Sequence, residues 1–332
     1  MPKDNLRLLS LDGGGVRGLS SLMILDRLMK HINEDAPPKP CEYFDMIGGT
    51  STGGIIAIML GRLRMSVTEC IEAYVSLSER VFRKQRSKWK INFHIQGRFN
   101  SKELAEVVKE VLVEQGFKRD ELLKDSPQAG CKVFVCATSK HNTDTVCLTS
   151  YRTPRGGNDD LLDAVTIWQA CRATSAASGF FDPIEIGRYD EQFVDGATGA
   201  NNPVREVWDQ AELLWGAPLE GKLERLVSIG TGMPSMQPFG DYVLDIVGTL
   251  RKLATETENT AEHFRREKSQ LASDGRYCRF NVPRGLENIG LEEAKRRNEI
   301  ASATRSYVKL EEVRTQMLVF AGKADKQNLP GE

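Results

Sequence analysis

The stretch Gly49-x-Ser51-x-Gly53 has the residue types and spacing of a nucleophile elbow, a sharp turn between a strand and a helix. Such a turn holds its serine in a strained backbone conformation, and side chains two positions before and after it would collide, which glycine avoids. The turn presents the serine hydroxyl at the edge of a sheet, with the first amides of the next helix directed at the group it attacks. Apolar runs on both sides fit a strand and a helix, so we expect Ser51 to be a nucleophile.

A second run of small residues, Asp12-Gly13-Gly14-Gly15-Val16-Arg17-Gly18, lies between an apolar run at 6–11 and a helical pattern at 19–31. A glycine loop between a strand and a helix is typical of a site that binds anions through backbone amides, because nothing obstructs their approach.

Three interpretations of this loop compete. Gly13-x-Gly15-x-x-Gly18 fits the dinucleotide-binding fingerprint, but that fingerprint needs an acidic residue at the end of the second strand, about 20 positions on. Glu34 and Asp35 have that spacing, yet they lie in a proline-rich loop. A Walker loop fails because no Lys-Ser or Lys-Thr follows the glycines. We favour the third interpretation, an oxyanion hole beside Ser51.

The two motifs, in this order and about 35 residues apart, resemble the start of the patatin-like lipid acyl hydrolases, a family that includes the calcium-independent phospholipases. The family's third motif is an Asp-Gly-Gly or Asp-Gly-Ala turn with the catalytic aspartate, and this chain has Asp195-Gly196-Ala197. The stretch 172–181 is also similar to the family's sequence before that aspartate. The resemblance covers roughly residues 6–232 and implies that Asp195 is catalytic.

The base that activates Ser51 has two candidates. A serine hydroxyl is a weak nucleophile until a neighbour accepts its proton, and α/β-hydrolases use a histidine that follows the acid in the chain. Of the four histidines only His263 follows Asp195, and it lies within a charged helical pattern that predicts a surface position. We therefore expect a Ser51–Asp195 dyad, in which partial burial raises the pKa of Asp195 above its usual value of about 3.9.

The resemblance implies a mechanism in which Asp195 accepts the proton while Ser51 attacks an ester carbonyl of a phospholipid. The amides of Gly13, Gly14 and Gly15, joined by Thr52, hold the oxyanion, a lysophospholipid leaves, and water cleaves the acyl-enzyme. We expect neither a metal nor a cofactor. The other motif residues are expected to support the site, with Asp12 tying the loop and Arg17 pairing at the helix start: Asp12, Arg17, Gly18, Gly49, Gly53 and Gly196.

Strands and helices must bring these motifs to one edge of a sheet. We expect strands at 6–11, 131–138, 144–151, 191–194 and 223–229, and helices at 19–31, 67–82, 101–115, 164–172 and 242–271. Strands separated by helices predict a patatin-like three-layer α/β/α fold with a mostly parallel central sheet, whose sites lie at strand carboxyl ends. Residues 1–322 are expected to form one patatin-like phospholipase domain, followed by a polar tail or linker at 323–332.

Composition limits the class of partner and the compartment. A chain of 332 residues with a net charge of −1 has no overall attraction to nucleic acid, so we expect no nucleic-acid partner. Seven cysteines without metal-ligand spacing indicate reduced thiols in an intracellular protein. No apolar run approaches the ~20 residues of a membrane span, and no signal layout opens the chain. We expect a cytoplasmic protein that contacts membranes peripherally.

Several alternatives stay open. Basic residues between Arg80 and Lys90, interleaved with Phe82 and Trp89, fit a patch for anionic lipid, although a solvated helix end is favoured. The pattern at 242–271 fits a lid or a packing helix. A dinucleotide-dependent oxidoreductase and a non-catalytic lipid-binding module are the rival functions. The polar end also suits fusion to regulatory domains in a longer chain.

Overall fold

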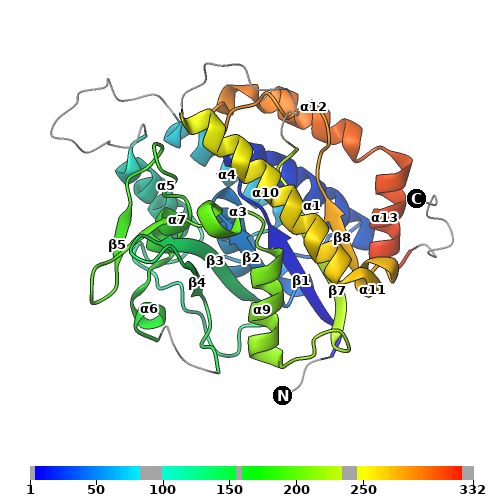
Figure 1. Ribbon diagram of the computed structural model, residues 1–332, viewed down its shortest axis with the longest axis horizontal. Coiled ribbons are helices and arrows are strands. Elements are labelled where there is room, and N and C mark those ends of the chain that lie inside the picture. The colour runs from blue at the N-terminus through cyan, green and yellow to red at the C-terminus, as the bar shows by residue number, and fades with distance from the viewer. Residues whose placement is uncertain (1–3, 83–98, 155–158, 234–244, 324–332) are drawn as a thin grey trace.

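The computed structural model describes residues 4–82, 99–154, 159–233 and 245–323, with side chains from Glu256 onward in the helix that begins at 245. At its centre lies an eight-stranded sheet in the order β5-β6-β3-β2-β1-β7-β8, with β4 also paired to β3 (Figure 1). The parallel strands are β1 (Leu6–Leu11), β2 (Met46–Thr50), β3 (Lys132–Ser139), β7 (Leu223–Ile229) and β8 (Tyr277–Phe280). Antiparallel to their partners are β4 (Thr145–Thr149), β5 (Ile184–Ile186) and β6 (Glu191–Asp195).

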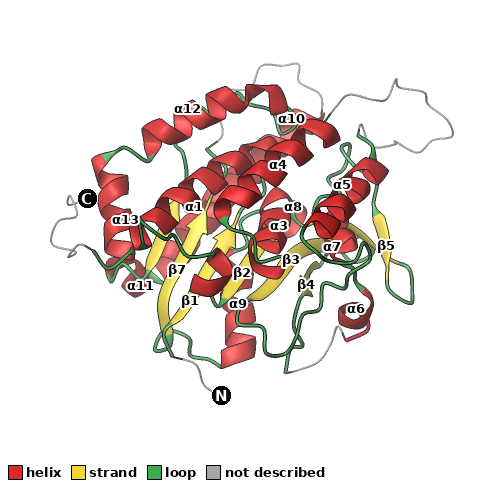
Figure 2. Cartoon of the chain, turned by 180° about the vertical axis from the view of Figure 1, so that it is seen from behind, coloured by secondary structure: helices red, strands yellow, loops and turns green. Residues whose placement is uncertain are grey.

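The sheet separates two apolar cores. Leu8 and Leu9 are neighbours in β1 and both are fully buried, yet they belong to opposite cores, as expected for strands covered by helices on both faces. One face carries α1 (Gly18–Ile32), α3 (Thr52–Ala57), α4 (Val67–Val81), α5 (Ser101–Glu114), α7 (Ile167–Thr174), α12 (Arg297–Tyr307) and α13 (Glu311–Phe320) (Figure 2). The other face carries α9 (Val204–Trp215), α10 (Asp245–Glu267) and α11 (Ser269–Ser273). The predicted three-layer α/β/α fold with a mostly parallel sheet is confirmed.

Short elements complete the chain. They are α2 (Pro40–Tyr43), α6 (Asp159–Ala164), α8 (Ala197–Ala200), the 3-10 turns at Gly15–Arg17 and Ala294–Arg296, and a π-helical turn at Ile58–Arg62. Over the described ranges, no helix combines the length and the apolar character that a membrane span requires.

The helix predicted at 242–271 is in fact two helices. α10 ends at Glu267 and α11 begins at Ser269, because Lys268 leaves the helical conformation. The Lys268 ammonium pairs with Glu220 at 2.9 Å and lies 4.0 Å from the centre of the Trp208 ring, so the break anchors the chain on α9.

Only one end of the predicted basic patch can be described. Arg80 forms ion pairs with Glu103 and Glu110 of α5, so its charge is already compensated. Residues 83–90 of the patch, and 324–332 of the expected tail, lie outside the described residues.

Candidate active site

Ser51 and Asp195 are brought together by strand β3. Strand β4 pairs along one edge of β3 over residues 134–138, so β2 and β6 must share the other edge. Thr50, the last residue of β2, pairs with Cys136, and Asp195, the last residue of β6, pairs with the next residue, Ala137. The two strands therefore end at the same point, from opposite directions, and Ser51 follows immediately.

Ser51 has the strained backbone of an elbow, with φ 52° and ψ −123°. A β-carbon on Gly49 would lie 2.2 Å from the Gly53 carbonyl oxygen, so the two glycines face one another across the turn as the motif predicts. The amide of Ser51 donates to the Thr174 hydroxyl at 2.8 Å, and that hydroxyl donates to the Cys136 carbonyl at 2.6 Å. The strain is thus maintained by bonds to the neighbouring helix and strand.

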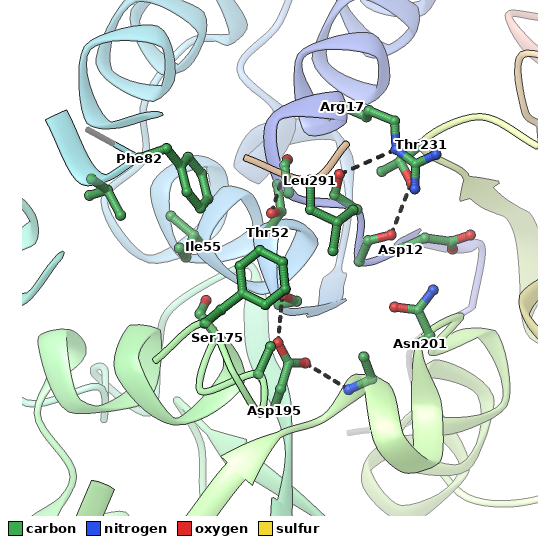
Figure 3. Close-up of a pocket in the computed structure, with 18 of the residues that line it drawn as sticks. Asp12, Arg17, Thr52, Ile55, Phe82, Ser175, Asp195, Asn201, Thr231 and Leu291 are labelled. Atoms are coloured by element: carbon green, nitrogen blue, oxygen red, sulfur yellow. Dashed lines mark hydrogen bonds between the residues drawn. The ribbon is translucent and has the colours of Figure 1, made fainter. Parts of the chain in front are cut away.

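The Ser51 hydroxyl donates a hydrogen bond to Oδ2 of Asp195 at 2.8 Å. Oδ1 accepts the Ala197 amide, also at 2.8 Å, so both carboxylate oxygens have fixed directions (Figure 3). The Asp195 side chain is only 4% exposed. Burial raises its pKa from 3.8 to about 7, and the two donated hydrogen bonds offset part of that rise.

His263 does not compete for this position. It lies on α10 with an exposed side chain, which confirms the predicted surface location.

The glycine loop presents two amides whose directions are fixed by hydrogen bonds to the carbonyl groups of the same peptides. The Gly13 carbonyl accepts the Thr231 hydroxyl at 2.9 Å, and because a peptide is planar this bond also orients the Gly14 N–H. The Gly14 carbonyl accepts the Arg17 amide at 3.2 Å and orients the Gly15 N–H in the same way. Among the described residues, neither the Gly14 nor the Gly15 amide has an acceptor.

Gly13 differs from the other glycines that the sequence places in the oxyanion hole. Its amide donates to the Asn201 carbonyl at 3.0 Å and is therefore already occupied. The amide of Thr52, at the start of α3, has no acceptor among the residues described, and the Thr52 hydroxyl bonds to the Gly15 carbonyl at 3.1 Å.

Asp12 holds the loop through a partner that the sequence did not reveal. Its carboxylate is 1% exposed and accepts from both terminal nitrogens of Arg279, at 3.0 and 2.6 Å. Burial raises the pKa of Asp12 to about 6, although the Arg279 charge opposes that rise. Arg279 lies in β8, a four-residue strand whose short apolar run was too weak a signal to be recognised.

Arg17 differs from its expected pairing at the helix start. Its side-chain Nε reaches the Gly14 carbonyl at 3.5 Å, and within the described ranges it forms no ion pair. Burial lowers the pKa of Arg17 to about 10. Both Arg17 and Asp12 line the pocket in front of Ser51.

The pocket has one apolar wall and one polar wall. Helices α3, α4 and α5 and the 175–181 loop supply the apolar side chains, among them Ile55, Leu77, Val81, Phe82, Phe180 and Phe181. Asn201, Thr231 and Asn281 lie on the polar side. Ser175 also lines the pocket, and its buried hydroxyl has no partner among the described residues, a feature that the sequence did not indicate.

The sequence model of the patatin-like phospholipases matches residues 9–208, which include all three motifs. The chain belongs to the patatin-like phospholipase family. It is 29% identical to phospholipase A I of Arabidopsis thaliana, over 85% of this chain and 25% of that protein. It is 30% identical to calcium-independent phospholipase A2-gamma of Rattus norvegicus, over 87% of this chain and 36% of that one. It is also 30% identical to the cGAMP-activated phospholipase of Vibrio cholerae, over 60% of this chain and 56% of that one.

This member of the family therefore spans about a quarter to somewhat over half of the length of these relatives. A structure of VipD from Legionella pneumophila covers 92% of this chain and 67% of its own, with 12% identity and a TM-score of 0.35. The family match ends at residue 208, so Thr231, α10 and β8 lie beyond it.

Proposed function

We propose that this protein is a serine lipid acyl hydrolase that cleaves fatty-acyl esters of phospholipids through a Ser51–Asp195 dyad, without a metal. The observation that carries the proposal is the 2.8 Å hydrogen bond from the Ser51 hydroxyl to the buried Asp195 carboxylate. The names of the relatives, phospholipase A I and phospholipase A2-gamma, support the same reaction and substrate class.

The chemistry proceeds in two halves. Asp195 accepts the Ser51 proton as the serine oxygen attacks the ester carbonyl, and a pKa of about 7 suits a base that acts near neutrality. The C–O bond to the alcohol then breaks, and Asp195 returns the proton to the leaving oxygen. Water, deprotonated by Asp195, next attacks the acyl-enzyme and releases the fatty acid and the free Ser51 hydroxyl.

The oxyanion is assigned to the amides of Gly14 and Gly15, with Thr52 as a third candidate. Gly13 is omitted because its amide is held by the Asn201 carbonyl. Fixed donors stabilise the transition state because they need no reorganisation when the charge forms.

Gly14→Ala is expected to lower kcat by ~10²–10³, the cost of losing one oxyanion donor. A β-carbon on Gly14 would lie 2.0 Å from the Thr231 hydroxyl, so the loop must shift and its amides with it. The matched control is Gly221→Ala, since a β-carbon at Gly221 meets nothing within 4 Å. Steady-state kinetics on one ester would measure both variants. A Gly14→Ala enzyme with wild-type kcat would place the oxyanion hole elsewhere.

The apolar wall of the pocket suits the acyl chain, and the polar wall suits the glycerol and head-group side of the substrate. We also propose that residues 1–322 act as one catalytic domain that meets its substrate at a membrane surface. The greater length of the relatives makes fusion to further domains in a longer chain part of the same proposal.

The test is hydrolysis of a mixed phospholipid panel by the wild-type protein, with and without a calcium chelator. We expect fatty-acid release that the chelator leaves unchanged. A strict calcium requirement would contradict the metal-free mechanism. Absence of ester hydrolysis, together with a higher melting temperature in NAD, would favour the dinucleotide-binding alternative instead.

A further inference from the structure

Three groups of the glycine loop are held by other parts of the fold: the Asp12 carboxylate, the Gly13 N–H and the Gly13 carbonyl. All three come just before the free amides of Gly14 and Gly15 in the chain. Arg279 binds the Asp12 carboxylate through both oxygens. The Asn201 carbonyl accepts the Gly13 N–H at 3.0 Å, and the Thr231 hydroxyl donates to the Gly13 carbonyl at 2.9 Å. The direction of the proposed oxyanion donors therefore depends on what fixes these three partners.

Two of the three partners are fixed by Glu258 of α10. Its Oε1 accepts from Arg279 Nη2 at 2.9 Å and from Asn281 Nδ2 at 2.7 Å. The Asn281 side chain in turn accepts the Gly232 amide at 2.7 Å, directly after Thr231. One oxygen of the Glu258 carboxylate thus positions both Arg279, which binds Asp12, and Asn281, which binds the residue after Thr231. The Glu258 side chain is 27% exposed.

The third partner is fixed by the preceding residue, Thr257. The Asn201 side chain donates to the Thr257 hydroxyl at 2.6 Å, and the Asn202 side chain donates to the Thr257 carbonyl at 3.3 Å. Thr257 is 7% exposed. The three supports of the loop therefore converge on two consecutive residues of α10, which crosses the molecule on the same face as α9 (Figure 1).

We propose that Thr257 and Glu258 are positioning residues for the oxyanion donors, so that this part of α10 is a fixed support of the active site. The inference rests on the proposed function of the Gly14 and Gly15 amides. A donor stabilises an oxyanion only when it lies about 2.7–3.1 Å from it, so a small shift of the loop lowers the rate. Substrate binding to the apolar wall does not depend on that shift, so KM should change little.

Arg279 itself is a poor variant for this test, because its loss would leave Asp12 buried without a partner. Glu258→Ala removes the acceptor used by Arg279 and Asn281 but leaves the Asp12–Arg279 pair in place. We expect kcat and the rate of Ser51 labelling by a fluorophosphonate probe to fall ~10-fold, with KM within about twofold. Amide hydrogen exchange of the 12–18 segment should become faster.

Two further variants control the experiment. Glu258→Gln keeps an oxygen acceptor at the position used by both Arg279 and Asn281, so it should retain most of the wild-type rate. Glu262→Ala lies one turn on in α10 and removes only exposed pairs with Arg265 and Arg266, so rate and exchange should stay unchanged. The proposal is supported if Glu258→Gln retains most of the wild-type rate while Glu258→Ala does not, and if Glu262→Ala changes neither rate nor exchange.

Wild-type kcat and wild-type exchange in Glu258→Ala would overturn the proposal. If Glu258→Ala fails to fold, Thr257→Val tests the same support, since valine has nearly the same shape and lacks the hydroxyl that accepts from Asn201. Unchanged kcat and exchange in Thr257→Val would then overturn it. A wild-type protein without esterase activity would instead refute the proposed function, while the exchange measurement would still report on the support.

Discussion

Ser51→Ala is expected to abolish ester hydrolysis and labelling by a fluorophosphonate probe while leaving the melting temperature nearly unchanged. Among the described residues the Ser51 hydroxyl makes one hydrogen bond, to Asp195, and the side chain is only half-buried, so little packing is lost. Removing the nucleophile of a serine hydrolase costs ~10⁶ in kcat, because the base then has nothing to activate. Fatty-acid release, probe labelling and thermal unfolding of the same preparation would measure the three effects together.

Ser175 provides the matched control for that experiment. It is the other serine among the described residues of the pocket, and its hydroxyl is buried without a partner there. Ser175→Ala should still be labelled by the probe. Labelling that persists in Ser51→Ala and disappears in Ser175→Ala would refute the assignment of the nucleophile, and retained turnover in pure Ser51→Ala would do the same.

Local features of this fold could be predicted from sequence because they depend on neighbouring residues. The strand at 6–11 and the strand at 223–229 were predicted with the observed bounds, since each is a short apolar run between turn signals. The strained Ser51 and the contact between Gly49 and Gly53 follow from a five-residue motif whose geometry permits few alternatives.

Features that depend on long-range pairing could not be predicted in this way. Nothing in the sequence shows that Asp195 pairs with Ala137 while Thr50 pairs with Cys136, although these registers place Ser51 beside Asp195. The Asp12–Arg279 ion pair joins residues 267 positions apart. Local patterns carry no information on such contacts, because the partner is chosen by the topology of the sheet.

The glycine loop at 12–18 also combines features that the sequence predicts with features that it does not. Its glycines predict free amides, but which amides are free depends on where Asn201 and Thr231 fall in the folded chain. Gly13 lies in the same motif as Gly14 and Gly15, and only the tertiary structure distinguishes it from them.

Asp195→Asn is the second variant for which we expect a nearly complete loss of activity. Asparagine keeps the shape of the side chain and still accepts the Ala197 amide, but it cannot accept the Ser51 proton. Because the two residues act as a unit, the double variant with Ser51→Ala should be no slower than either single variant. His263→Ala, on the exposed face of α10, should change kcat little.

The raised pKa of Asp195 predicts opposite effects of pH on activity and stability. In the wild type, kcat/KM should fall about tenfold per pH unit below pH 7, because the base must be ionised to act. Stability behaves differently, since a pKa raised from 3.8 to about 7 means that the folded protein favours the neutral carboxyl. That contribution is present below about pH 4 and is lost as the pH rises through 7.

Asp195→Asn cannot ionise, so it should be more stable than the wild type at pH 8, by on the order of a few degrees in melting temperature. The difference should shrink toward pH 4, because the Asp195 carboxyl of the folded wild type is neutral there and the wild type no longer carries a buried charge. An inactive variant that is also stabilised at high pH would identify Asp195 as a base kept buried for its chemistry. If His263→Ala were inactive and Asp195→Asn only slowed, the result would instead indicate a Ser–His pair oriented by Asp195. Activity that does not depend on pH between 5 and 7 would show that Asp195 is not the base.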